Sequence, residues 1–502
     1  MLCAMIGRVL WRATVTVHRY LGIAVGALML MWFISGMVMM YVPFPQLSPV
    51  QHLSTLAPIP LNACCAAGAI KLADDEPVLA TQIETLLGKA VVRIRPDGRP
   101  PIYATLADGA PVAIDAAEAR ATAREAAPRI TGLNSRLAAS ELIDRDQWTV
   151  AEDYESDRPL YRFSFDDPRH TQAYISGSSG EVVLWTTGAQ RFWNWLGAVP
   201  HWLYFTQLRS NGPLWSKIVI WTSIAGGFLT ALGLYLAVTQ FRRGARLSPY
   251  RGWTMWHHLI GLIFGVFALA WVVSGTISMN PWGFLEGSGG NERALLAGEP
   301  LSWSAYRDSL SALTRNPSLA GMVSLTSAPQ AGKLFWLARW PDGKILRLDG
   351  NGQTAPLQPA ELPRLAGIVA AGRPIESAEL MNREDSYYYR GVTGGRFTLP
   401  VYRVTLSDAA HTRYYFDPRT GALMGRIDSA RRGYRWLFDG LHHMDFFAWM
   451  RLRPLWDMLV LLLMLGGIGV TGTGCYLAIA RIRRDLRSAA AALSLRVRDV
   501  SE

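Results

Sequence analysis

The sequence predicts an integral membrane protein with four transmembrane helices and two α+β domains outside the membrane. Three observations predict this fold class. Hydrophobic residues make up 50% of the 502 residues and charged residues 18%, a bias typical of membrane proteins. Four uncharged stretches are each long enough to cross about 30 Å of hydrocarbon. The two halves of the chain also align with each other, each as helix, polar segment, helix.

The uncharged stretches cover residues 20–44, 218–239, 259–285 and 458–480. The first is too long and continuous for a cleaved signal peptide, and no small-residue cleavage site follows it, so we expect a retained helix. The chain then divides into an N-terminal segment (1–16), helix one (17–44), a first external domain (45–195), an interfacial segment with helix two (196–241), a loop (242–255), helix three (256–285), a second external domain (286–435), an interfacial segment with helix four (436–480) and a tail (481–502).

Arginines predict the orientation, because three short basic regions flank the predicted helices. The positive-inside rule places these regions, and with them both termini, in the cytoplasm. In a bacterial inner membrane the two external domains would then lie in the periplasm. The net charge of +11 is largely explained by this topology, so we expect a lipid bilayer and no nucleic acid as partner. The arginines concerned are Arg8, Arg12, Arg242, Arg243, Arg246, Arg251, Arg481, Arg483, Arg484 and Arg487.

The predicted external domains contain strand-like runs, such as residues 160–165 and 401–406, and two turns, 176–180 and 417–421, that read as strand–turn–strand. His170 and His411 precede these turns, and a structural role is favoured for both, although the sequence does not define it. Cys64 and Cys65 are adjacent, so a mutual disulfide would be strained. No CxxCH motif occurs, which excludes covalent c-type haem.

An internal repeat relates the halves of the chain. Identical residues recur at an offset of 239 in helices one and three, and at an offset of 241 from Tyr161/Tyr402 onward. Because each half begins on the same side, the repeats are parallel, and equivalent residues lie at the same membrane depth. Identical pairs include His18/His257, Gly22/Gly261, Gly26/Gly265, Trp32/Trp271, Ser35/Ser274, Gly36/Gly275, Arg162/Arg403, His170/His411, His201/His442, Trp215/Trp456 and Thr230/Thr471.

Six of the nine histidines lie at helix ends. Ionisable groups at membrane depth are costly and usually functional, and neutral imidazole is a common axial ligand of haem iron. We therefore interpret the six as ligands of two b-type haems; metal sites without haem, proton relays and interfacial histidines are the alternatives. His18, His257 and His258 lie at the cytoplasmic ends, and His201, His442 and His443 near the external face.

Depth restricts the pairing of these ligands. About 25 residues separate His18 from the far end of helix one, roughly 35 Å at 1.5 Å per residue, so one haem cannot bridge His18 and His201. The repeat favours His18 with His257 and His201 with His442. His258 and His443, which have no counterparts in the first half, remain as alternate ligands or as partners of haem propionates.

Glycines follow the inner histidines at four-residue intervals, on the same helix face. Small residues beside a ligand leave room for a porphyrin, although the same pattern is typical of helix-packing faces. A zinc site would need cysteine or carboxylate neighbours at close spacing, and neither histidine cluster has them. The glycines are Gly22, Gly26, Gly261 and Gly265.

Several motifs resemble those of the PepSY-associated transmembrane (PepSY-TM) family, over nearly the whole chain. They are His18-Arg19-Tyr20-Leu21-Gly22, Trp32-Phe33-Ile34-Ser35-Gly36, Trp436 to His442 followed by Pro454-Leu455-Trp456 and Thr471-Gly472, and the hairpins ending in Gly180-Glu181-Val182 and Gly421-Ala422-Leu423. The resemblance implies PepSY-like external domains. It also implies a haem-containing ferric-siderophore reductase, an oxidoreductase whose haem ligands are His18, His201, His257 or His258, and His442 or His443.

This chain differs from family members that are fused to a flavin- or nicotinamide-binding domain, because it has no Gly-rich dinucleotide fingerprint. We therefore expect a separate electron donor: a flavoprotein, a quinol or a small reductant. The predicted reaction is the reduction of Fe³⁺ to Fe²⁺ in a periplasmic ferric siderophore. The alternatives are a haem b cytochrome with another acceptor and a non-enzymatic PepSY sensor or siderophore-uptake accessory.

Overall fold

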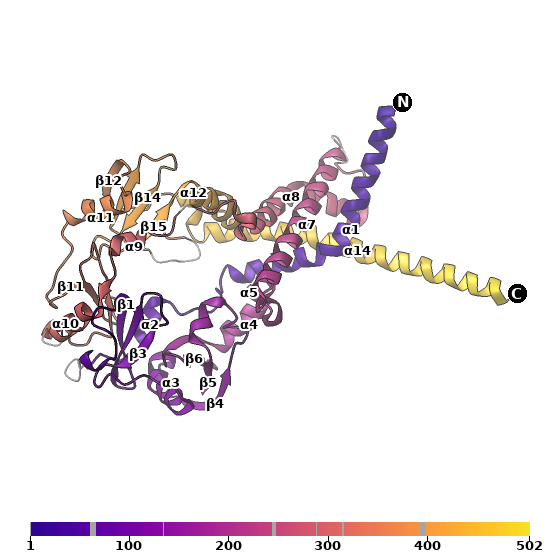
Figure 1. Ribbon diagram of the computed structural model, residues 1–502. Helices are drawn as coiled ribbons and strands as arrows, with labels where there is room; N and C mark the ends of the chain where they lie inside the picture. Colours follow the sequence, from indigo (N-terminus) through magenta and orange to yellow (C-terminus); the bar gives the residue numbers. More distant parts are fainter. Residues whose placement is uncertain are drawn as a thin grey trace.

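A computed structural model of the chain describes residues 2–60, 67–133, 135–242, 247–287, 289–313, 316–391 and 397–501. A helical bundle forms one end and β-sheets form the other, and both termini lie at the bundle end, away from the sheets (Figure 1). Cys64, Cys65, Arg243 and Arg246, which the sequence analysis discussed, lie outside the described residues.

Four helices in the described part of the chain are long and apolar enough to cross a membrane, which confirms that prediction by length and composition. Two of them end ahead of a proline, Pro43 and Pro281, because proline cannot donate the next helical hydrogen bond. The last continues through the basic segment after residue 480, which we expected only as a tail. These helices are α1 (Leu2–Met39), α7 (Gly212–Thr239), α8 (Gly252–Ser278) and α14 (Leu455–Ser501).

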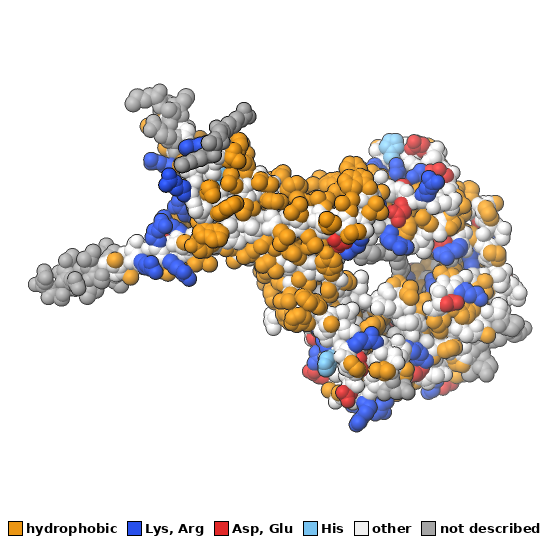
Figure 2. Space-filling view, turned by 180° about the vertical axis from the view of Figure 1, so that it is seen from behind, with side chains coloured by type: hydrophobic (Ala, Val, Ile, Leu, Met, Phe, Trp, Pro, Cys, Tyr) orange, Lys and Arg blue, Asp and Glu red, His pale blue; other side chains and the backbone are white. Residues whose placement is uncertain are grey.

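The four helices pack in a closed ring in which α1 contacts α7 and α14, and α8 contacts the same two helices. α1 and α8 therefore face each other across the bundle. Large apolar side chains cover the outside of the bundle, where Figure 2 shows a nearly continuous hydrophobic surface. A surface of this kind is suited to lipid. Basic side chains gather at the end of the bundle near the termini in the same view.

The largest sheet combines strands from both external segments. Its order is β11-β10-β9-β1-β2-β3, with β8 beside β1, and Ile83 of β1 pairs with Leu325 of β9. We call it the composite sheet. The two-domain division that we expected does not include this feature, which joins the two segments through backbone hydrogen bonds. Its strands are β1 (Pro77–Leu86), β2 (Lys89–Pro96), β3 (Ile102–Thr105), β8 (Leu301–Ser302), β9 (Ser324–Ser327), β10 (Phe335–Arg339) and β11 (Ile345–Asp349).

Two further sheets have the same design, four antiparallel strands in sequence order after one helix. The first external unit contains α3 (Ala116–Thr131), β4 (Arg136–Ile143), β5 (Leu160–Asp166), β6 (Gln172–Ser176) and β7 (Val182–Thr186). The second contains α11 (Glu361–Ala370), β12 (Ile375–Met381), β13 (Val401–Leu406), β14 (Arg413–Phe416) and β15 (Leu423–Ile427). The strands expected at 160–165 and 401–406, and both strand–turn–strand predictions, are confirmed.

Short helices connect the sheets to the bundle and to one another. Those of the first half are α2 (Pro49–Thr55), α4 (Gly188–Leu196), α5 (Ala198–Trp202) and α6 (Thr206–Arg209). Those of the second are α9 (Glu292–Ala297), α10 (Trp303–Leu313), α12 (Ser429–Tyr434), a π-helical turn (Arg435–Gly440) and α13 (Leu441–His443). Short 3-10 turns lie at Ala67–Ala69, Glu152–Asp157, Pro281–Gly283, Pro317–Leu319 and Ala448–Arg451. The connectors α5 and α13 carry the outer histidines.

Candidate functional site

The inner histidines face each other across the bundle. His18 belongs to α1 and His257 to α8, the two helices on opposite sides of the ring. Their ring centroids are 6.3 Å apart. The structure therefore brings together the two inner residues that the repeat had paired.

The outer histidines form a similar pair at the other end of the bundle. His201 lies on α5 and His442 on α13, and their ring centroids are 6.2 Å apart. A π-helical turn directly precedes α13, and π-helical turns occur frequently at functional sites. Both connectors pack against the bundle, α5 on α1 and α13 on α8.

Hydrogen bonds fix the tautomer of the inner pair. His18 Nδ1 donates to the Leu229 carbonyl oxygen at 3.1 Å, and His257 Nδ1 donates to the Val470 carbonyl oxygen at 3.1 Å. A carbonyl oxygen only accepts, so the proton lies on Nδ1 and the lone pair on Nε2. The two acceptors, on α7 and α14, occupy positions offset by 241, as the alignment of the halves predicts.

Serine hydroxyls hold the outer pair in the same way. His201 Nδ1 lies 3.1 Å from Ser35 Oγ, and His442 Nδ1 lies 3.0 Å from Ser274 Oγ. Each hydroxyl donates its own proton to a carbonyl of its helix, at 2.7 Å for Ser35 and 3.0 Å for Ser274. Each therefore accepts from the histidine. Among the described residues, none of the four Nε2 atoms has a hydrogen-bond partner. Histidines that bind a metal through one ring nitrogen usually donate the other ring N–H to an acceptor in this way.

The two alternate histidines have different surroundings. His258 Nε2 donates to the Ala237 carbonyl oxygen at 2.9 Å, and its Nδ1 lies 3.0 Å from Ser248 Oγ. Nε2 of His258 thus carries the proton, and the Nδ1 lone pair accepts from the Ser248 hydroxyl, so no lone pair is free for a metal. His443 stands beside His442 with its Nδ1 3.8 Å from Asp439. His257 and His442 are thus the residues of the second half that face a histidine of the first half and have Nδ1 hydrogen-bonded, with His258 and His443 beside them.

Glycines pack against each of the four facing histidines. A Cβ atom on Gly233 would lie 2.8 Å from His18 Cε1, and one on Gly474 would lie 3.2 Å from His257 Cε1. A Cβ added to Gly36 would lie 3.3 Å from His201 Cε1, and one added to Gly275 would lie 3.7 Å from His442 Cε1. The predicted glycines differ among themselves: a Cβ on Gly261 would meet nothing within 4 Å, whereas one on Gly265 would clash with Leu234 of α7 at 2.7 Å. Gly265 therefore serves helix packing, and Gly261 leaves open space.

The geometry fits a haem between the two rings of each pair. Iron–imidazole bonds of about 2 Å, with about 1.1 Å from Nε2 to the ring centroid, place two opposed centroids ~6.2 Å apart. Both pairs match this spacing. At the outer level, Trp32 Nε1 and Arg435 Nη1 are buried without a partner among the described residues. Burial also lowers the pKa of His201 to about 4, which keeps its imidazole in the neutral form that binds metal.

Comparison with protein families identifies a relationship over most of the chain. The family described as the PepSY-associated TM region matches residues 15–481. The chain belongs to the PepSY-associated transmembrane family. The matched region includes all six helix-end histidines and both four-stranded external units. The comparison with curated proteins finds no match.

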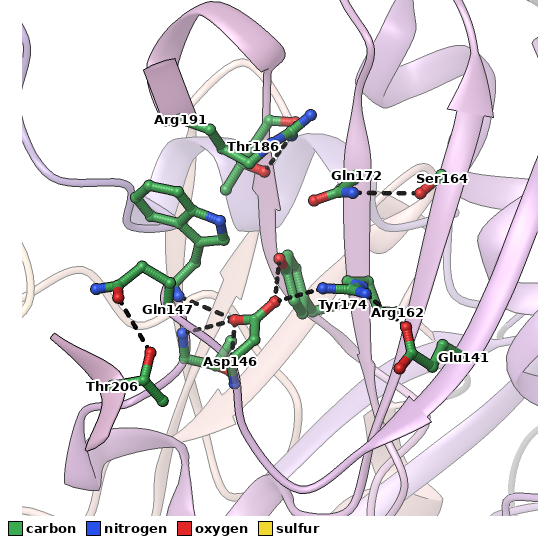
Figure 3. A network of polar contacts seen from close by, with 12 residues as sticks. Glu141, Asp146, Gln147, Arg162, Ser164, Gln172, Tyr174, Thr186, Arg191 and Thr206 are labelled. Carbon is green, nitrogen blue, oxygen red and sulfur yellow. Dashed lines mark hydrogen bonds and ion pairs between the residues drawn. The ribbon is translucent and has the colours of Figure 1, made fainter. Parts of the chain in front are cut away.

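A polar network in this PepSY-associated protein holds the connector that follows His201. Asp146 Oδ2 accepts hydrogen bonds from the Tyr174 hydroxyl at 2.8 Å and from Arg162 at 3.1 Å (Figure 3). The next residue, Gln147, accepts from Thr206 Oγ1 at 3.0 Å and donates to the Tyr204 carbonyl oxygen. The loop between β4 and β5, which carries Asp146 and Gln147, is thus fixed to the sheet on one side and to the segment after α5 on the other.

The second external unit repeats the core of this network. Asp385 Oδ2 accepts from the Tyr415 hydroxyl at 2.9 Å and from Arg403 at 2.9 Å. Sequence reasoning noted the repeated pair Arg162/Arg403 but missed Asp146 and Asp385, whose only signal was their spacing of 239. His170 and His411 are exposed turn residues with φ of 48° and 42°, which agrees with the structural role favoured for them.

Proposed function

We propose that this protein carries electrons across a membrane through two b-type haems and reduces ferric siderophores beside its external units. The observation that supports this proposal best is the presence of two facing histidine pairs, each with Nδ1 hydrogen-bonded and Nε2 free. When bound, haem b would supply one-electron redox chemistry. The residues that would hold it are His18 with His257, and His201 with His442.

The two pairs lie at different depths of one bundle. Ser35, which contacts His201, follows His18 on α1 by 17 residues, since 35 − 18 = 17, and Ser274 follows His257 on α8 by the same number. At 1.5 Å per residue the separation along the helices is roughly 25 Å. This distance is most of the ~30 Å thickness of a bilayer core. A stack of two sites can therefore span the hydrocarbon, which a single site cannot.

The protein's own residues would prepare each site in three ways. The carbonyl and hydroxyl acceptors set the tautomer of the imidazoles and orient their Nε2 atoms. The bundle buries the rings and keeps water from them. Finally, the glycines leave the space beside the rings free of side chains. In the proposed orientation the basic end of the bundle and both termini lie in the cytoplasm, and the external units lie in the periplasm of a bacterial inner membrane.

The proposed substrate is a ferric siderophore, which takes up one electron as Fe³⁺ becomes Fe²⁺. Hard oxygen ligands bind Fe²⁺ less tightly than Fe³⁺, so reduction releases the iron from the chelator. A separate donor, whether a flavoprotein, a quinol or a small reductant, supplies the electron. The two parallel halves, each with helix, external unit and helix, provide the twofold framework that puts one histidine of each half into each site.

An absorption spectrum of the purified protein tests the proposal. We expect a low-spin b-type spectrum with about two haems per chain. Absence of haem would overturn the proposal and favour a non-enzymatic PepSY protein. Anaerobic mixing of the dithionite-reduced protein with ferric siderophores, with an Fe²⁺-specific chelator present, then tests the substrate. Failure of every siderophore to re-oxidise the protein would indicate another acceptor.

Replacing Gly233 by alanine should weaken the inner site alone. The new Cβ would lie 2.8 Å from His18 Cε1, so the ring must move from its position opposite His257. We expect haem content to fall by about one per chain or the inner haem to become more readily extracted. Gly472→Ala is the matched control, because a Cβ at Gly472 of α14 meets nothing within 4 Å. Equal haem content and equal extraction rates in both variants would contradict a role for Gly233 in shaping the site.

A further inference from the structure

Three side chains from distant parts of the chain meet in the external region. His52 lies on α2, Glu84 on β1 of the composite sheet, and Glu181 in the turn before β7 of the first external unit. One potential ligand atom of each lies within 4.8 Å of the other two. Two ligand atoms on opposite sides of a metal ion, with bonds of about 2.1 Å, are ~4.2 Å apart. A small movement of the side chains would therefore bring all three ligand atoms within bonding distance of one ion.

Only part of the bonding capacity of this cluster is satisfied. His52 Nε2 lies 3.1 Å from Glu84 Oε2, and Gln82 donates to Glu84 Oε1 at 2.7 Å. In contrast, the Glu181 carboxylate accepts no hydrogen bond from any described residue. Arg93 is nearby, but its guanidinium stands 5.4 Å over the Tyr103 ring, and no ion pair joins it to either glutamate within the described ranges. Glu181 thus faces Glu84 without a cation bonded to it.

A cavity of about 40 Å³ adjoins the two carboxylates. A water molecule needs ~10–15 Å³ of such space, so the cavity is large enough for an ion with bound water. Its wall includes Glu84, Glu181, Arg93, Tyr103, Glu125 and Arg129. Burial, with a smaller contribution from the neighbouring Glu84 carboxylate, raises the pKa of Glu181 to about 7. A bound cation would relieve the repulsion between the two carboxylates.

We propose that His52, Glu84 and Glu181 bind one divalent first-row transition-metal ion, such as Mn²⁺, Fe²⁺ or Zn²⁺. The two carboxylates offset the charge of the ion. The imidazole favours a transition metal over Ca²⁺ or Mg²⁺, which take oxygen ligands. This site does not depend on the haem sites, since none of its residues contacts them.

The cluster is not a requirement of the repeated fold. Asn291 stands at the position offset by 239 from His52, and Ala422 at the position offset by 241 from Glu181. The second unit forms its own four-stranded sheet with these residues in place. In the first half the ion would join the composite sheet to the first external unit, since α2 also packs on α3 and β7. Bound ion should therefore stabilise the external region.

The test uses the full-length protein in detergent after removal of metal with a chelator. Free Mn²⁺ gives a six-line EPR spectrum that is lost on binding, so titration yields the number and affinity of sites. We expect one site per chain, with affinity lowered by about tenfold or more in Glu181→Gln and in Glu84→Gln. Glu125→Gln is the matched control, because Glu125 lines the same cavity outside the cluster and should leave binding unchanged.

Competition experiments complete the test. Zn²⁺ and Fe²⁺ should displace Mn²⁺, and a large excess of Mg²⁺ should not. The proposal is overturned if the wild type binds no Mn²⁺, if Glu181→Gln binds as the wild type does, or if Mg²⁺ competes equally. Glu181 is only half-buried, so we expect Glu181→Gln to fold. This variant therefore still tests the proposal if Glu84→Gln fails to fold. Unchanged haem content in Glu181→Gln separates this result from the outcome for the haem sites.

Discussion

His201→Ala and His442→Ala are each expected to lower haem content from about two to about one per chain, and both should remove the same haem. The two rings face each other with centroids 6.2 Å apart, and each has its Nδ1 bonded to a hydroxyl. Loss of either ring would remove one of the two residues that would hold the outer haem. The inner pair, His18 and His257, lies at the other end of the bundle and should keep its haem.

The double variant His201→Ala/His442→Ala gives the sharpest result. It should retain about one haem, with the spectrum and midpoint potential of the single variants. His18→Ala and His257→Ala should form the complementary set, in which the outer haem remains. His258→Ala is the matched control for His257→Ala, because both nitrogens of His258 are already hydrogen-bonded. A double variant without any haem would show that the two outer histidines serve different sites, contrary to the pairing by depth.

Asp445→Ala is expected to destabilise the outer connector, the π-helical turn (Arg435–Gly440) with α13, by about 3–5 kcal/mol. The Asp445 side chain is 1% exposed and forms ion pairs with Arg435 at 3.3 Å and with Arg451. Arg435 is itself 3% exposed. Removing the Asp445 carboxylate leaves the Arg435 guanidinium buried without a counter-charge. A buried unpaired charge is among the most costly defects in a protein.

The measurement is thermal or denaturant unfolding of the detergent-solubilised protein, followed by circular dichroism. Asp485→Ala provides the control, because Asp485 pairs with Arg481 at 2.9 Å on the exposed end of α14. Exposed pairs of this type contribute little, so that variant should unfold as the wild type does. Similar unfolding of the two variants would show that the buried cluster does not hold the connector. The outer haem should also dissociate more readily in Asp445→Ala, since α13 follows the Arg435 turn directly.

The sequence was sufficient for the membrane helices and for the repeated strands. Hydropathy is a local property, so each apolar stretch predicted its own helix, and the errors lay at helix ends: near the prolines, in the N-terminal segment (1–16), most of which belongs to α1, and in the tail after residue 480. Alternation and turn residues likewise predicted the strand at 401–406 with its exact bounds. The offset between halves reduced six histidines to two sets of three because equivalent residues share a depth.

Within each set, only the tertiary structure distinguished the histidines. His257 and His258 are neighbours in sequence, but one Nδ1 donates to the Val470 carbonyl oxygen and the other ring is occupied at both nitrogens. The deciding acceptors include backbone carbonyls, which every residue type has, so no residue pattern indicates them. The roles of Ser35 and Gly233 were missed for the same reason, since their function depends on which ring lies against them.

Long-range pairing was equally invisible to sequence reasoning. The composite sheet joins Ile83 to Leu325, and no periodicity records which distant strand a given strand will meet. His52 was left without any role, because its partners Glu84 and Glu181 follow 32 and 129 residues later, by 84 − 52 = 32 and 181 − 52 = 129.

By itself, the sequence determined the helices, the repeat and the histidines worth considering. Which side chains face each other, and which nitrogen is free to bind a metal, depended on packing and hydrogen-bond directions that arise only when the chain is folded.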